Sequence, residues 1–328
     1  MVYAHLGEFS ALLVACFWTI TALAFESASL KVGSLSVNLI RLVLAFVFLS
    51  IFNWIFRGAF LPRDAGLYQW FWLSFSGLIG FVFGDLCLFE SFTLIGSRLA
   101  MLIMTLAPPL AAVSGYFILH EHLTVYSFLG MVITLTGVGL AVISHKSSQE
   151  VSDLSNQPKL PFTWMKKRLN PDNSKNGHPS MSLNIPIKGL LLAFGGAIGQ
   201  AFGLTLSKKG MAGYDAFAST QIRIITGIIG FAIIILILRR GQQTLSAFGN
   251  RAAMKGISIG SFFGPFLGVS LSLFSLKYTS TGIAATIMAT VPILIIPPAI
   301  LIYKQKITLQ EVIGAILSVI GVALFFIK

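Results

Sequence analysis

The chain has 328 residues, of which 55% are hydrophobic and only 10% are charged, and its mean hydropathy is +0.86. A soluble protein of this size cannot bury so many apolar side chains, so the composition excludes an ordinary soluble domain and predicts that lipid surrounds most of the chain. The net charge of +12 comes from few residues, nearly all placed between apolar runs, which argues against a nucleic-acid-binding surface.

Apolar runs long enough to cross a bilayer, about 20 residues each, recur along the whole chain. Ten spans are predicted, at about residues 8–25, 35–56, 67–89, 98–119, 125–144, 187–206, 216–238, 255–276, 281–303 and 308–327. The polar segment 145–186 is interpreted as a linker between a first half, 1–144, and a second half, 187–328. We therefore expect an all-α polytopic membrane protein with ten transmembrane helices.

The second half repeats the first. Residues 108–143 read PPLAAVSGYFILHEHLTVYSFLGMVITLTGVGLAVI, and residues 292–327, at an offset of 184, read PILIIPPAILIYKQKITLQEVIGAILSVIGVALFFI. Upstream the offset becomes 182, so that NLIR, ending at Arg41, aligns with TQIR, ending at Arg223. Five spans is an odd number, so the second half enters the membrane with the opposite orientation. Inverted five-helix repeats are typical of secondary transporters.

Prolines interrupt the fourth span of each repeat, at Pro108 and Pro109 in the first and at Pro292, Pro297 and Pro298 in the second. Each proline removes a backbone donor and bends or breaks its helix. Equivalent broken helices in two inverted halves indicate a nearby substrate cavity. A static kink is the alternative, because transmembrane helices tolerate proline.

Glycines at spacing four line one face of the sixth and eighth predicted spans, where they favour close helix packing. They are Gly195, Gly199 and Gly203 in one span and Gly256, Gly260, Gly264 and Gly268 in the other.

Charged residues inside predicted spans are candidates for function, since each costs about 2.5–3.5 kcal/mol on insertion scales. Asp85 is the deepest acid, and Arg41 and Arg98 lie in spans that meet it at one membrane face. We expect Asp85 to pair with Arg98 or Arg41, either to gate or bind a proton during transport or as a static tie. Arg223, the repeat partner of Arg41, is expected near the opposite face. The two arginines would then attract an anionic or carboxylate-bearing substrate from opposite ends of a cavity, or extend to lipid headgroups.

Three further side chains in the spans, Trp18, Gln200 and Gln221, are candidates to line a mostly apolar cavity. No metal site, cofactor or catalytic residue is predicted. The neighbouring His120, Glu121 and His122 cannot all face one ion, so the elbow they form is expected to organise the fold.

The elbow HEHLT, followed by a helix ending in Gly-Val-Gly-Leu, resembles the signature of EamA-type transporters in the drug/metabolite transporter superfamily. Supporting matches are FGDLCLFESFTLIGSRLAMLIMTLAPPL (83–110) and GPFLGVSLSLFSLKYTSTGIAATIMATVP (264–292). The resemblance covers nearly all the chain apart from 145–186. It implies ten helices in two inverted halves around a central cavity, and transport of small metabolites such as amino acids, often outward. The sequence departs from the family pattern at Lys304-Gln305-Lys306, Glu26 and Thr19.

The sequence therefore predicts a secondary transporter in the cell (plasma or inner) membrane that moves a small metabolite, an amino acid or a related compound, by alternating access. Anionic compounds are among the candidate substrates. The protein is predicted to be an exporter rather than an enzyme, because no P-loop or nucleophile–base arrangement is visible. Its expected partners are the substrate, the bilayer and, as a candidate coupling ion, the proton. The alternatives are a membrane-embedded transferase and a non-transporting structural protein. Orientation stays open, because the resemblance implies cytoplasmic termini whereas the Lys/Arg count favours a cytoplasmic linker.

Overall fold

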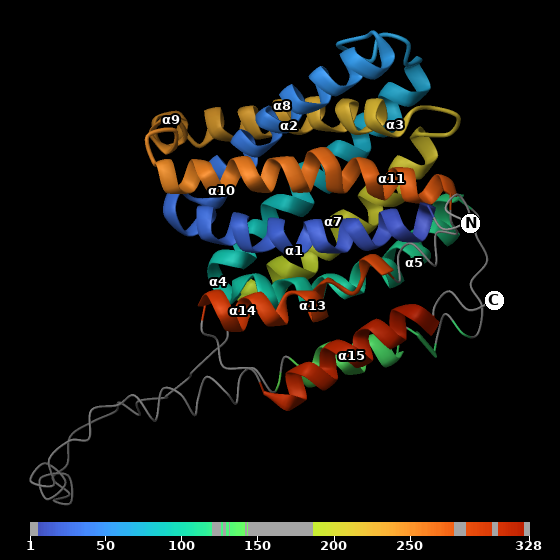
Figure 1. The fold of residues 1–328 in the computed structure, drawn as a ribbon, viewed down its shortest axis with the longest axis vertical. Helices are drawn as coiled ribbons and strands as arrows, with labels where there is room; N and C mark the ends of the chain where they lie inside the picture. The colour runs from blue at the N-terminus through green and yellow to red at the C-terminus, as the bar shows by residue number, and fades with distance from the viewer. Residues whose placement is uncertain are drawn as a thin grey trace, which may run out of the picture.

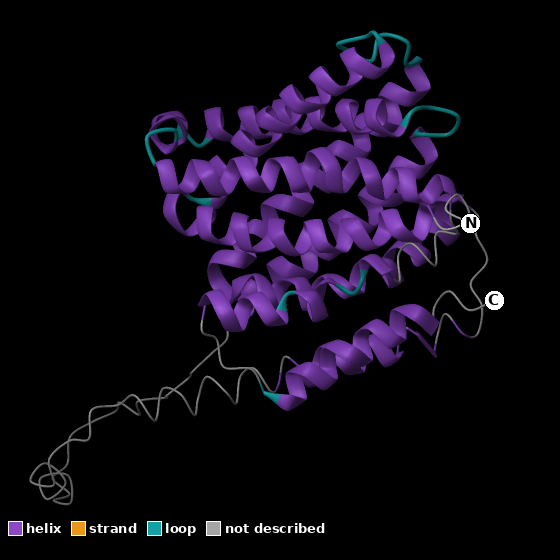
Figure 2. Ribbon diagram, viewed as in Figure 1, coloured by secondary structure: helices purple, strands orange, loops and turns teal. Residues whose placement is uncertain are grey.

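The computed structural model describes residues 6–119, 126, 129–130, 132–141, 143, 186–278, 287–303 and 308–324. Within these ranges the chain is helical with short connections and contains no strand (Figure 2). Lipid offers the backbone no hydrogen-bond partners, and only helices and closed barrels satisfy all backbone hydrogen bonds internally. The described part of the chain is thus all-α, as predicted.

The first repeat contains α1 (Leu6–Val32), α2 (Ser34–Arg57), α3 (Leu67–Gly77), the π-helix η2 (Leu78–Gly84), α4 (Asp85–Ile103), the 3₁₀ turn η3 (Met104–Leu106), α5 (Ala107–Leu119) and an apolar helix at Val132–Ala141. The second contains α7 (Ile187–Gly210), α8 (Ala216–Ile237), α9 (Gly241–Ala247), α10 (Arg251–Ser261), the π-helix η5 (Phe262–Gly268), α11 (Val269–Tyr278), α13 (Val291–Leu294), α14 (Ile296–Tyr303) and α15 (Leu309–Leu324). Six stretches of the described residues are long and apolar enough to cross a membrane. One of them, Leu67–Leu119, turns back at Gly96, whose φ of +76° breaks the helix, so that it supplies both the third and the fourth predicted span.

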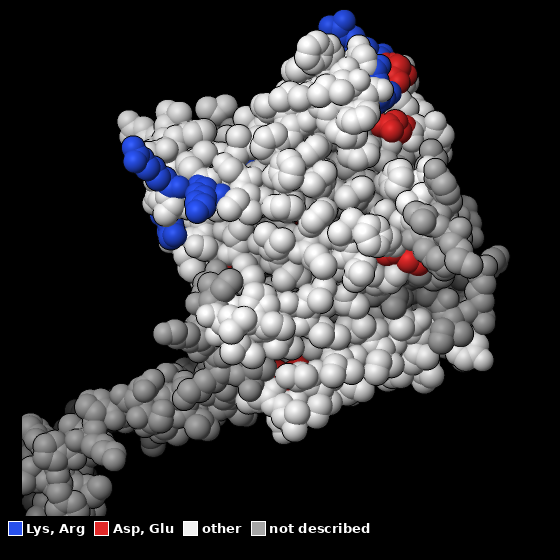
Figure 3. All heavy atoms as spheres, viewed as in Figure 1, with Lys and Arg blue, Asp and Glu red and all other residues white. Residues whose placement is uncertain are grey.

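The long helices run side by side, and Figure 1 separates two ends of the bundle. The end that contains α9 and the turn at Gly33 between α1 and α2 is called the α9 end. The end at which α3 begins is called the α3 end. Charged side chains gather toward these two ends, and the surface between them is almost uncharged (Figure 3). Exposed apolar residues such as Val47 and Ile51, the 14th and 18th of the 24 residues of α2, occupy that middle belt, as expected of a surface that faces lipid.

The two halves pack against each other in a reciprocal pattern. The first helix of the first half, α1, contacts α10, η5 and α11, while its counterpart α7 contacts α3, η2 and α4. The second helices of the two halves, α2 and α8, contact each other. Residues at the 184 offset also exchange contacts, since Gly137 lies against Ser318 and Gly314 while Gly321 lies against Thr134 and Gly130. This is the pattern expected of two inverted repeats.

Both third helices contain a π-helical segment, and the two segments, Leu78–Gly84 and Phe262–Gly268, are separated by the repeat offset of 184 residues. A π-bulge is rare and frequently occurs at a functional site, because it interrupts the regular i→i−4 bonding and redirects side chains. In the first half the bulge ends directly before Asp85. In the second half the residue after the bulge is Val269, so the repeat is symmetric in backbone and asymmetric in charge.

The predicted proline breaks coincide with irregular backbone. The 3₁₀ turn Met104–Leu106 directly precedes the helix that carries Pro108 and Pro109. In the second half the chain is interrupted at Ile295, between a short helix that holds Pro292 and α14, which holds Pro297 and Pro298. Broken fourth helices therefore occur in both repeats.

Candidate functional site

Asp85 lies buried between the two halves, with 4% of its surface exposed. Its carboxylate accepts hydrogen bonds from Arg41 of α2 in its own half and from Gln200 Nε2 of α7 in the other half, the latter at 2.6 Å. Asn38 Nδ2 donates to the Asp85 backbone carbonyl at 3.3 Å. Asp85, on α4, is thus held by side chains of two other helices, α2 and α7, one from each repeat.

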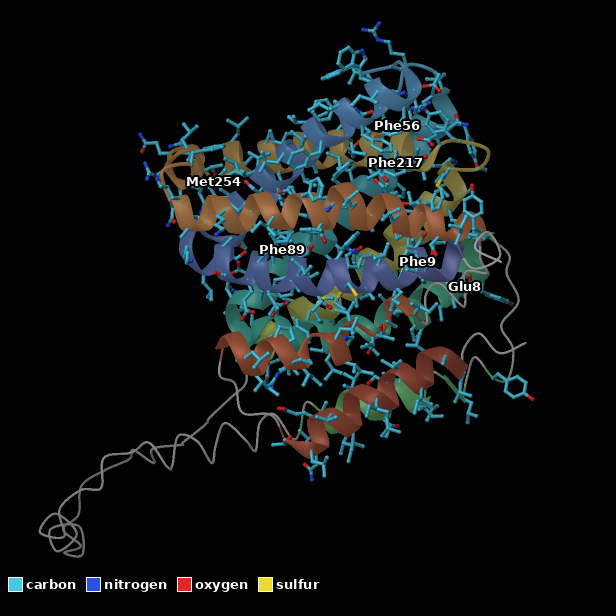
Figure 4. All side chains as sticks on the ribbon, viewed as in Figure 1. Glu8, Phe9, Phe56, Phe89, Phe217 and Met254 are labelled. Atoms are coloured by element: carbon cyan, nitrogen blue, oxygen red, sulfur yellow. The ribbon has the colours of Figure 1, made fainter. Side chains whose placement is uncertain are left out.

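Arg41 pairs with Asp85 and is itself fixed by its surroundings. Its Nε donates to Asn38 Oδ1 at 3.0 Å, and its guanidinium carbon lies 4.5 Å from the ring centre of Phe89 and 5.6 Å from that of Phe25. Aromatic faces stabilise a desolvated cation by about 2 kcal/mol or more. In Figure 4 Phe89 lies between the α9 end, marked by Met254, and the α3 end, marked by Phe56 and Phe217, so this pair belongs to the middle of the bundle.

Arg223 of α8 reaches the same region from the other repeat. Its guanidinium carbon lies 4.7 Å from the ring centre of Phe81, a ring that Arg41 also approaches at 5.8 Å. Only 4% of Arg223 is exposed. Among the described residues it forms no ion pair within 4.0 Å, and its Nε has no hydrogen-bond partner. A buried guanidinium without a direct partner is costly and marks a place where an anion would be stabilised.

The prediction that Arg41 and Arg223 lie at opposite ends of a cavity is wrong, because both approach Phe81. Each is the eighth residue of its helix, α2 or α8, and the two helices start at opposite ends of the bundle. Seven residue steps advance about 10 Å along an α-helix, roughly a third of the hydrocarbon thickness. The long side chains cover the remaining distance, so inverted positions meet in the middle.

The cluster of Arg41, Asp85, Gln200 and Arg223, which we call the central cluster, has two guanidinium groups and one carboxylate. Its formal charge is therefore one positive unit, in a region shielded from water by Phe25, Phe81 and Phe89. Buried charge of one sign is stabilised by bringing in the opposite sign. The arrangement suits a ligand with one carboxylate, because a guanidinium binds a carboxylate in a planar two-point contact.

Arg98 does not join the central cluster. Its Nη1 lies 3.4 Å from Glu311 Oε2 at the start of α15, and Glu311 also exchanges capping bonds with Thr308 at 3.2 Å. On the other side, Glu26 of α1 accepts a hydrogen bond of 2.5 Å from Ser97 Oγ. These residues fasten the Gly96 turn to helices of both halves, so of the two partners predicted for Asp85 the structure selects Arg41.

The two other predicted cavity residues lie elsewhere. Gln221 is fully buried between α8 and α2, where it accepts a bond from Asn53 Nδ2 at 2.9 Å and donates to Ser50 Oγ at 2.9 Å and to the Phe60 carbonyl at 3.0 Å. Trp18 packs its indole against Gly268, at the end of the second π-helix. Pro292 lines a void of about 20 Å³ beside Arg98 and Glu311.

An ionic contact outside the spans connects the two halves at the α3 end. Asp64 accepts hydrogen bonds from Arg57 at 2.6 Å and from Tyr214 at 2.9 Å. Desolvation and the bond to Asp64 raise the pKa of Tyr214 to about 12. Desolvation alone would raise the pKa of Asp64, but the bonds from Tyr214 and Arg57 hold it below its ordinary value. The contact therefore favours a neutral phenol and an ionised carboxylate at neutral pH.

No group of three or more His, Cys, Asp or Glu residues that could hold a metal ion occurs in the described ranges. The elbow His120–His122 lies outside the described residues.

Comparison with known proteins decides the family. The model of the EamA-like transporter family matches residues 5–143 and 187–327, one match for each half. The chain belongs to the EamA-like transporter family. A solved crystal structure, titled only as that of a protein, shares the fold with a TM-score of 0.59 and 16% sequence identity, over 97% of this chain and 95% of that one. A search of the curated proteins found no match.

Membership makes this EamA-like protein a multi-span membrane protein of a transporter family in the drug/metabolite transporter superfamily, as the sequence predicted. The family consists of transporters rather than enzymes. Two kinds of residue that surround the central cluster were not predicted from the sequence. Asn38 stands in the repeated NLIR motif, which signalled it, whereas Phe25, Phe81 and Phe89 are three among 28 phenylalanines and carry no signal of their own.

Proposed function

We propose that this EamA-like transporter is a secondary transporter that moves a small metabolite with a carboxylate, an amino acid or a related compound, across the cell membrane by alternating access. The proposal includes outward transport, ten spans, and two repeats, 1–144 and 187–328, joined by the linker 145–186. It is supported by the family match to each half and by the reciprocal contacts between the halves.

The buried guanidinium of Arg223 carries the proposal. It is the one member of the central cluster with no direct partner among the described residues, and it shares a neighbourhood with an acid already bound to Arg41 and Gln200. A substrate carboxylate placed beside Phe81 would pair with Arg223 and bring the cluster to two positive and two negative charges. Asp85 then keeps Arg41 in place and repels an anion that is wrongly positioned.

Alternating access requires contacts that differ between states. The bond from Gln200 to Asp85 joins the two halves, so a movement of α7 along α4 would lengthen it. Gly80 and Gly84 face Gly203 and Gly199 across this interface without side chains between them, which permits such a movement. When the bond from Gln200 is lost, a proton on Asp85 would take the place of the Gln200 donor. Asp85 is thus the candidate for proton coupling.

Flux into proteoliposomes tests the proposal, with a panel of small carboxylates offered with and without a pH gradient. We expect Arg223→Gln to abolish flux, and Asp85→Asn to reduce it strongly and remove its dependence on the gradient. Arg251→Gln, an exposed arginine at the start of α10, is the matched control and should transport normally. Normal flux in a well-expressed Arg223→Gln variant would contradict the proposed site.

A further inference from the structure

A cavity of about 300 Å³ opens at the α9 end, away from the central cluster. Its first-half lining includes Ser29, Ser34, Ser36 and Glu90, and the second half contributes Arg240 and Gln243. Figure 1 shows why these residues meet, because α9 lies beside the turn that joins α1 and α2. The volume is at the lower limit of ligand pockets, which suits a metabolite of a few heavy atoms.

Glu90 gives this cavity a negative group. Its Oε2 accepts a hydrogen bond of 2.6 Å from Ser34 Oγ, and Glu90 forms no ion pair with any described residue. The Glu90 side chain is partly buried, so a cation that reaches it would gain more than at an open surface.

Two further observations indicate a ligand. Ser29 lines the cavity with only 3% of its surface exposed, and its buried hydroxyl has no hydrogen-bond partner. A buried polar group of this kind costs free energy unless something binds it. Arg240, an exposed residue from the opposite half, also lines the cavity and forms no ion pair with Glu90 among the described residues.

We propose that this cavity binds a small zwitterion, a compound with both an ammonium and a carboxylate group, with Glu90 facing the ammonium and Arg240 the carboxylate. The hydroxyl of Ser29 supplies a further hydrogen bond. Because the two charged groups come from different halves, relative movement of the halves would separate them and release the ligand. The inference rests on the proposed function in one respect: it makes the cavity the entry or exit site for the substrate of the central cluster.

The position of Glu90 supports this relation. Glu90 lies five residues after Asp85 on α4, which corresponds to about 7.5 Å along the helix axis. Along the α4 axis, Glu90 is therefore about one and a half helical turns from Asp85. A molecule in the cavity would need to pass Phe89, which packs over Arg41, to reach the central cluster.

Calorimetric binding to the purified full chain in detergent tests the proposal with L-alanine, L-serine and L-threonine and with their N-acetyl derivatives. Acetylation removes the ammonium and keeps the carboxylate. We expect at least one free amino acid to bind about tenfold or more tightly than its derivative, the effect of losing a hydrogen bond between charged groups. Equal binding of the two forms, or no binding by any of them, would overturn the proposal.

Variants then locate the effect. Glu90→Gln should abolish the preference for the free amino acid, and Arg240→Gln should weaken its binding about tenfold. Arg239→Gln, the neighbouring arginine that does not line the cavity, should leave binding unchanged. If Glu90→Gln still prefers the free amino acid over its N-acetyl derivative, the assignment of Glu90 is overturned. The comparison on the unmodified chain tests the proposal even where a variant fails to fold.

The two proposals can fail separately. Suppose that transport is lost in Arg223→Gln but is unchanged by acetylation of the substrate and by Glu90→Gln. This result would support the central cluster and reject the cavity site. Binding that requires Glu90, without flux of any carboxylate, would retain the cavity site and reject the proposed function.

Discussion

Substitution of Gly199 tests how closely α7 lies on the first π-helix. A Cβ at this position would come within 3.0 Å of Gly84 Cα, lie 2.8 Å from Gly84 N and lie 3.0 Å from the Ile79 carbonyl oxygen. All three atoms are backbone, so they cannot turn aside. Carbon atoms prefer a separation of about 3.5–4.0 Å, and Gly199→Ala therefore forces the helices apart by roughly 1 Å.

Overpacking of this kind costs about 1–3 kcal/mol, while alanine in place of glycine gains up to about 1 kcal/mol of helix propensity. We expect a net destabilisation of about 1–2 kcal/mol. The same displacement would lengthen the 2.6 Å bond between Gln200 and Asp85, so transport should fall as well.

Thermal unfolding in detergent, followed by size-exclusion chromatography, measures the effect. The matched control is Gly195→Ala, one turn away on the same helix, where the nearest neighbour of the new Cβ is the Cys87 side chain at 3.4 Å. The control should melt like the unmodified protein or slightly higher. Equal melting temperatures for the two variants would refute the proposed close contact between α7 and the π-helix.

Three further outcomes are expected. Asp85→Asn should destabilise the protein by about 3–5 kcal/mol, because it leaves the buried Arg41 guanidinium without its carboxylate partner. Adding Arg41→Gln should recover part of this loss in denaturant unfolding. Gly33→Ala should lower the melting temperature by more than Gly58→Ala. Gly33 has φ +85° and ψ 146°, a backbone conformation closed to residues with a side chain. Gly58 has φ +65° and ψ 11°, the left-handed helical region that other residues enter at a cost of about 1–2 kcal/mol. The pKa of Tyr214 is raised to about 12, so the contribution of its phenol to stability is present below the unfolded pKa near 10 and is lost as the pH rises through 12. An ultraviolet titration should show a tyrosine that ionises near pH 12 and that is absent from Tyr214→Phe. Ionisation of Tyr214 near pH 10 would contradict the bond to Asp64.

The internal repeat was the most informative feature of the sequence. The offset of 182 residues predicted that Arg41 and Arg223 occupy equivalent places, and both arginines belong to the central cluster. The offset of 184 residues relates the two π-helices, which contain glycine at the paired positions Gly80 and Gly264. Such equivalences survive in sequence because close backbone packing leaves little choice other than glycine.

The partners of the charges could not be predicted in the same way. Asp85 had two candidate arginines at the same membrane face, and the choice between Arg41 and Arg98 depends on how far each helix is rotated about its axis. That rotation is set by many small packing contacts rather than by a motif. Glu26 illustrates the same limit: the first span was predicted to end at residue 25, but the helix continues to Val32 because Ser97 satisfies the carboxylate.

The central claim is that the buried Arg223 guanidinium receives a substrate carboxylate. Counterflow into proteoliposomes tests it most directly, with a transported carboxylate compared with its methyl ester, which lacks the charge and adds one methyl group. We predict that the ester is not carried by the unmodified protein, and that Arg223→Gln carries neither compound. Transport of the ester at the rate of the free carboxylate would contradict the claim.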